Sequence, residues 1–111
     1  MKQLIIFLFA LMVGSSSVVA QTVDPVWIDV RTAEEHAESS ISGHPNIPHV
    51  QIADRIDDLV SDKDATLYLY CATGRRAGVA RETLEQLGYT NIVNVGGIAD
   101  ARECLEQGLS C

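Results

Sequence analysis

Short apolar runs alternate with amphipathic stretches along most of the chain. Runs rich in β-branched and aromatic residues predict strands over residues 26–30, 66–70 and 91–95. Apolar positions at helical spacing predict helices over residues 33–38, 50–60, 77–87 and 98–107. Repeated strand–turn–helix units of this size are typical of α/β folds. We therefore expect a parallel sheet with helices on both faces.

The first 20 residues follow a different pattern. Lys2 precedes an unbroken apolar run from Leu4 to Val13, and small residues lead to Ala20. This is the pattern of a secretory signal peptide cleaved after Ala20. An uncleaved membrane anchor is the alternative, but the ten apolar residues fall short of the roughly 20 that a spanning helix needs. We expect a signal peptide at residues 1–20, export to the periplasm, and one domain at residues 21–111.

Charge and cysteine content narrow the class of protein. The 111 residues carry 8 Lys and Arg against 15 Asp and Glu, a formal net charge of −7. An acidic chain is a poor candidate for nucleic-acid binding. The 47% hydrophobic content argues against a fully disordered chain. Three cysteines cannot all pair within one chain, so at least one is free or bonded to a partner.

One strand-to-helix turn combines a cysteine with cationic residues. Its sequence is Cys71, Ala72, Thr73, Gly74, Arg75 and Arg76, followed by Ala77 at the predicted helix start. Open α/β sheets bind ligands at this edge, and a glycine permits the tight bend. Backbone N–H groups, the helix N-terminus and the arginines all favour a thiolate, so we expect a nucleophilic Cys71. The alternative is an inert, buried cysteine beside solvated arginines.

Three stretches resemble the single-domain rhodaneses, a family of thiosulfate sulfurtransferases, and in particular its small exported members. They are residues 27–36, residues 70–78 with the cysteine turn, and residues 88–98 with a predicted Gly96–Gly97 turn. With Asn-Ile-Pro at residues 46–48, the likeness covers nearly the whole mature chain. The family usually has Gly-His-Ile-x-Gly-Ala before Asn-Ile-Pro. Residues 39–45 read Ser-Ser-Ile-Ser-Gly-His-Pro instead, so the shape of this loop does not follow from the resemblance.

The resemblance implies a rhodanese-like fold and a specific chemistry. Cys71 would take sulfur from thiosulfate or a similar small anionic donor and carry it as a persulfide. A thiophilic acceptor such as cyanide or a thiol would then remove it. The N–H groups from Ala72 to Ala77 would stabilise the anionic sulfur. Arg75 and Arg76, above all Arg76, would orient the donor, whereas Asp29 and Arg31 would be structural.

Two other functions are compatible with a cysteine–arginine turn. Phosphatase loops place five residues between the cysteine and the arginine, whereas four separate Cys71 from Arg76. The shorter ring suits a persulfide better than a tetrahedral phosphate. A non-enzymatic persulfide carrier or sensor for a protein partner would use the same cysteine.

The remaining candidate groups are less specific. Cys104 and Cys111 could form a disulfide if the tail folds back, or Cys104 could be buried and Cys111 free. The histidines lack metal-ligand spacing with the cysteines, and no nucleotide motif is present, so we expect no metal and no organic cofactor. Glu34–Glu35 and Asp57–Asp58 are interpreted as solvated helix faces. We expect a monomer without a nucleic-acid partner or stable membrane anchor.

Overall fold

The computed structural model describes residues 25–108 and 111, so the predicted signal peptide lies outside the described residues. Its elements in chain order are β1 (Val26–Asp29), α1 (Ala33–Glu38), the 3-10 turn η1 (His49–Gln51), α2 (Ile52–Leu59), β2 (Thr66–Cys71), α3 (Arg75–Gln86), β3 (Asn91–Gly97) and α4 (Ile98–Glu106). The strands pair in parallel in the order β1–β2–β3, which puts β2 in the centre. The expected α/β class is confirmed.

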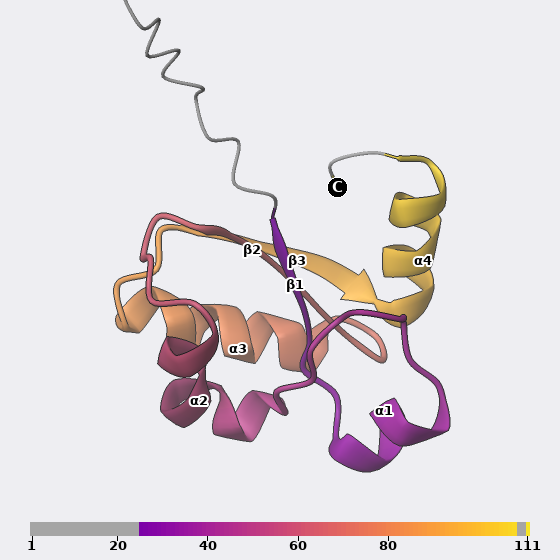
Figure 1. Ribbon diagram of the computed structural model, residues 1–111, viewed down its shortest axis with the longest axis horizontal. Coiled ribbons are helices and arrows are strands. Elements are labelled where there is room, and N and C mark those ends of the chain that lie inside the picture. Colours follow the sequence, from indigo (N-terminus) through magenta and orange to yellow (C-terminus); the bar gives the residue numbers. More distant parts are fainter. Residues whose placement is uncertain (1–24, 109–110) are drawn as a thin grey trace, which may run out of the picture.

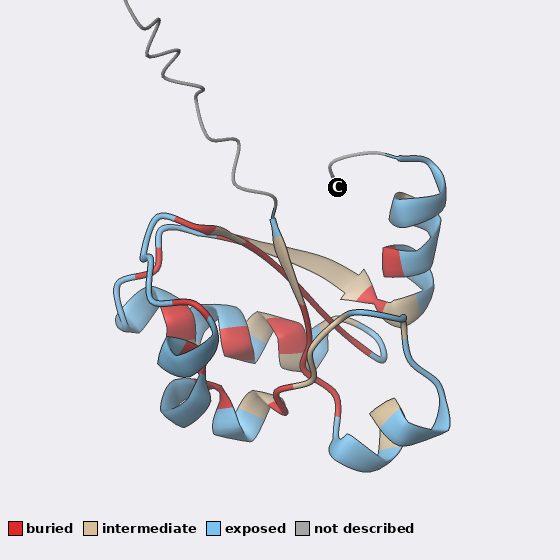
Figure 2. Cartoon of the chain, viewed as in Figure 1, coloured by how far each residue is buried: buried red, intermediate tan, exposed pale blue. Residues whose placement is uncertain are grey.

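The main hydrophobic core lies between the sheet and helices α2 and α3. Alternate residues of β2 face this core, because successive side chains of a strand point to opposite faces. Its most deeply buried members are Ile28, Val30, Ile52, Ile56, Leu67, Leu69, Cys71, Ala77, Ala80 and Leu84. Figure 2 shows the buried positions of α3 on the side that faces the sheet. In Figure 1, α2 and α3 lie below the sheet, whereas α4 stands on its other side next to the end of β3, so helices flank both faces.

Aromatic rings occupy the second face of the sheet. Trp27 stacks on His44 with ring centroids 5.4 Å apart, and its ring centroid lies 4.8 Å from that of Tyr68. The His44 Nδ1 and the Tyr70 hydroxyl are hydrogen-bonded at 2.9 Å. Burial lowers the pKa of His44 and raises that of Tyr70, so both rings are neutral at neutral pH. These contacts hold His44 against the sheet and so position the loop of residues 39–45. The family resemblance did not predict the shape of this loop.

Several element boundaries differ from the sequence prediction, and two of these differences involve glycines. Helix α3 begins at Arg75 rather than Ala77, because Gly74 adopts a φ of 102° and caps the helix. Strand β3 continues through Gly96 and Gly97, which pair with Tyr70 and Cys71, so the predicted glycine turn is wrong. The pairing register shifts just before Gly96, as in a β-bulge. None of the described helices is long and apolar enough to cross a bilayer.

Candidate active site

Cys71 lies at the carboxyl end of the central strand, with its sulfur facing the start of α3. The residue is 1% exposed, and the Gly74 N–H donates a hydrogen bond to Sγ at 2.9 Å. The bend that aims this N–H at the sulfur uses the left-handed conformation of Gly74, which other residues rarely adopt. Ala72 and Thr73, the residues between them, are exposed. A helix N-terminus and a backbone donor therefore stabilise negative charge on this sulfur.

The glycine pair at the end of β3 packs directly against the cysteine loop, residues 71–76. A Cβ on Gly97 would collide with the Ala72 carbonyl, and one on Gly74 would lie 3.1 Å from the Gly96 Cα. The two glycines thus let a strand end approach the loop backbone more closely than any side chain would allow. The rigid sheet holds the loop in place.

Asn94 braces the cysteine loop from the same strand. Its Nδ2 donates to the Gly74 carbonyl at 2.9 Å, and its Oδ1 accepts from the Gly96 N–H at 3.0 Å. The strand pattern of residues 91–95 did not predict this contact. The available signal was an amide side chain among apolar neighbours in a half-buried strand, just before the glycine pair.

Arg76 forms an ion pair with Glu35 of α1. Its guanidinium donates to both carboxylate oxygens, at 2.6 and 3.0 Å. The same carboxylate accepts from the Thr32 N–H in the capping box of α1. The hydrogen bonds from Arg76, and to a lesser degree those from Thr32, outweigh burial and lower the pKa of Glu35 from 4.5 to about 2. The interpretation of Glu35 as a solvated helix residue is therefore wrong, because the fold brings α1 against the start of α3.

Arg75, unlike Arg76, is exposed and has no carboxylate partner among the described residues. It is the one cationic side chain of residues 25–108 without a hydrogen-bond or ion-pair partner. Both arginines lie in the first turn of α3 rather than in a loop before it. The start of α3 thus carries one partnered and one unpartnered guanidinium.

A buried charge cluster stabilises the sheet end beside this loop. Asp29 is 0% exposed and accepts hydrogen bonds from the backbone and guanidinium of Arg31, the shortest at 2.7 Å. His36 Nδ1 lies 2.8 Å from the same carboxylate. Burial acts to raise the pKa of Asp29, but the hydrogen bonds from Arg31 and His36 outweigh it and hold the pKa below its usual value of 3.8. These contacts agree with a structural role for Asp29 and Arg31.

The cluster also fastens the segment that contains Asn-Ile-Pro. The Asn46 amide donates to the carbonyls of Asp29 and Arg31, both at 2.9 Å. The Ile47 N–H donates to the Asp29 carbonyl at 2.9 Å. The segment therefore runs alongside the end of β1 as a short parallel bridge.

The three cysteines divide into one free thiol and one disulfide. Cys104 and Cys111 are bonded, with their Cα atoms 5.8 Å apart, so of the two alternatives the structure has the bridge. Cys71 is free. Among the described residues, no group of three or more His, Cys, Asp or Glu side chains is placed to hold a metal ion.

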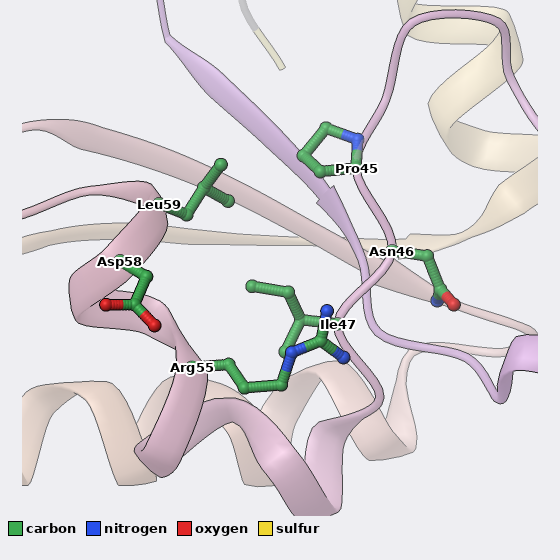
Figure 3. A pocket seen from close by; sticks show the side chains of 6 residues that line it. All are labelled: Pro45, Asn46, Ile47, Arg55, Asp58 and Leu59. Carbon is green, nitrogen blue, oxygen red and sulfur yellow. The ribbon is translucent and has the colours of Figure 1, made fainter.

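A pocket of about 270 Å³ lies apart from the cysteine loop (Figure 3). It opens between α2 and the 45–47 segment, and none of its lining residues comes from the cysteine loop. They are Pro45, Asn46, Ile47, Arg55, Asp58 and Leu59. This pocket is therefore separate from the residues that surround the Cys71 sulfur.

The fold and the site place this chain among α/β domains in which the central strand of a parallel sheet presents a free cysteine to a helix N-terminus. Residues 17–103 match the family model of the rhodanese-like domain, and the chain belongs to this sulfurtransferase family. The thiosulfate sulfurtransferase PspE of Escherichia coli K12 is 42% identical over 74 residues, which are 67% of this chain and 71% of that protein. A sulfurtransferase of Allochromatium vinosum is 34% identical over 88 residues, 78% and 80% of the two chains.

A solved structure shows the same fold. It is a rhodanese with anions from Escherichia coli, which superposes with a TM-score of 0.66 at 40% identity. The match covers 69% of this chain and 91% of that one. The predicted rhodanese-like fold is therefore confirmed.

Proposed function

We propose that the protein transfers sulfane sulfur from thiosulfate, or a similar small anionic donor, through a persulfide on Cys71. The thiolate attacks the outer sulfur of thiosulfate, the S–S bond breaks, and sulfite leaves with the bonding electron pair. A thiophilic acceptor such as cyanide or a cellular thiol then attacks the outer sulfur of the persulfide. Cyanide leaves as thiocyanate, and the Cys71 thiolate is restored.

The hydrogen bond from the Gly74 N–H to the Cys71 sulfur is the observation that carries this proposal. An acceptor-side attack needs the sulfur of Cys71 to leave as an anion, and a fixed backbone donor stabilises that anion without reorganisation. The exposed guanidinium of Arg75 can attract an anionic donor to the same loop. The sulfurtransferases among its relatives support the same chemistry.

Mass spectrometry of the reduced protein after incubation with thiosulfate tests the proposal. We expect one added sulfur on the peptide that contains Cys71, and loss of that sulfur with thiocyanate formation when cyanide is added. A persulfide that forms but does not turn over with cyanide or small thiols would favour a carrier or sensor for a protein partner. Phosphate release from a phosphomonoester without any persulfide would favour the phosphatase alternative and overturn the proposal.

We also propose that the protein acts in the periplasm as a monomer, without a nucleic-acid partner, metal, organic cofactor or stable membrane anchor. The pattern of residues 1–20 supports export. The Cys104–Cys111 disulfide fits an oxidising compartment. Fractionation of a bacterium that expresses the full chain should recover it in the periplasm, with Gln21 at its N-terminus. Recovery of the intact chain, Met1 included, from the cytoplasm would contradict export.

A further inference from the structure

The Glu35–Arg76 ion pair joins two helices at the edge of the cysteine loop. Glu35 comes from α1 and Arg76 from the first turn of α3, 41 positions apart in the sequence. Two hydrogen bonds of 2.6 and 3.0 Å give the pair the fork geometry of a specific arginine–carboxylate contact. The Arg76 side chain is 26% exposed and the Glu35 side chain 33%, so the pair is partly shielded from water.

Arg76 lies near the nucleophile as well as beside Glu35, because it stands in the first turn of α3, and Gly74 at the start of this helix donates to the Cys71 sulfur. The Glu35 hydrogen bond raises the pKa of the Arg76 guanidinium above its usual range, and an interaction with Cys71 acts in the same direction. The carboxylate of Glu35 therefore offsets a positive charge that would otherwise act in full on an anion at Cys71. The positive charge of Arg75 is not offset in this way, because Arg75 has no carboxylate partner among the described residues.

We propose that Glu35 is a specificity-determining residue that sets how strongly the cysteine loop favours anionic reagents. The sequence has two adjacent arginines at this loop, Arg75 and Arg76. Because Glu35 offsets the charge of Arg76, only the charge of Arg75 acts in full on a reagent. A dianion such as thiosulfate is attracted less strongly than two unpaired arginines would attract it, and neutral sulfur compounds compete better. The part of this inference that concerns sulfur donors rests on the proposed function. The preference of the loop for anionic over neutral reagents does not depend on that function.

The test compares an anionic and a neutral reagent of similar size at Cys71. Iodoacetate and iodoacetamide both alkylate a thiolate with loss of iodide, and the Cys104–Cys111 disulfide leaves Cys71 as the reacting thiol. Both rates depend in the same way on the fraction of Cys71 that is a thiolate, so their ratio is independent of any change in that fraction. We expect Glu35→Gln to raise the iodoacetate-to-iodoacetamide ratio about three- to tenfold at low salt, as one unscreened nearby charge would. Added salt should reduce the gain.

The chain offers matched controls for this substitution. Glutamine keeps the acceptor that the capping box needs, so α1 should still form. Glu34→Gln removes the same charge from the adjacent, exposed position of α1 and should change the ratio little. Adding Arg76→Ala to Glu35→Gln should remove the gain, because the gain acts through Arg76.

Three outcomes would overturn the inference: an unchanged ratio in Glu35→Gln, an equal gain in Glu34→Gln, or a gain that persists without Arg76. Alkylation needs no sulfur donor, so these results do not depend on whether thiosulfate is the substrate. If thiosulfate does load Cys71, Glu35→Gln should lower the thiosulfate concentration needed for half-maximal loading by a similar factor.

Discussion

Cys71→Ser is expected to abolish persulfide formation and sulfur transfer while the protein remains folded. A serine hydroxyl has no sulfur to carry and is not ionised at neutral pH, so neither half of the reaction can proceed. The side chain is nearly the same size as cysteine, and its oxygen can accept the Gly74 N–H that now reaches Sγ. Mass spectrometry after thiosulfate treatment, thiocyanate production and thermal unfolding of the same preparation measure the three consequences.

A matched control uses the same substitution at the other cysteines. The double variant Cys104→Ser and Cys111→Ser removes the disulfide, which closes a loop only seven residues long. It should keep its persulfide and its turnover, and lose no more than a few kcal/mol of unfolding free energy. Wild-type turnover in Cys71→Ser would contradict the mechanism, and inactivity of the double variant would show that the bridge contributes to the site.

The fold could be predicted from the sequence because its strands and helices follow local periodicity. Residues 66–70 form a short apolar run of β-prone residues, and the structure has the buried strand β2 there. Thr32 and Glu35 have the spacing of a capping box, and the structure has this box at the start of α1. The errors fall where packing overrides local preference. Gly96 and Gly97 have the composition of a turn, but the close approach of Ala72 explains why a strand end needs residues without side chains there.

The site could be predicted only as far as its residues are neighbours in sequence. Cys71 and Gly74 stand within one turn, so their proximity follows from chain geometry. The Arg76–Glu35 pair and the Asn94–Gly74 contact connect positions 41 and 20 residues apart. The local pattern marks Glu35 as the capping-box partner of Thr32, but it does not indicate the contact with Arg76, which arises from the packing of α1 beside α3.

Asp29→Ala is expected to cost about 3–5 kcal/mol of unfolding free energy, the loss typical when one partner of a buried ion pair is removed. The guanidinium of Arg31 is 7% exposed and would keep its charge without the carboxylate. The same change removes the hydrogen bond to His36. Chemical denaturation at neutral pH measures the loss. A domain of this size has a total stability of about 5–15 kcal/mol, so a variant that unfolds at 25 °C is studied at low temperature or with stabilising salt.

Two comparisons separate the buried charge cluster from a general effect of removing an aspartate. Asp57→Ala breaks an exposed pair with Lys63, in which the Lys63 nitrogen and the Asp57 oxygen are 3.9 Å apart, and should change stability by less than about 1 kcal/mol.

The second comparison is the dependence of stability on pH. Because the folded pKa of Asp29 lies below its usual value of 3.8, its contribution is complete above that pH and is lost as the pH falls through the folded pKa. Wild-type stability should therefore fall more steeply in acid than that of Asp29→Ala. Parallel acid profiles, or equal losses from the two alanine variants, would mean that Asp29 does not act as a buried, ionised partner of Arg31.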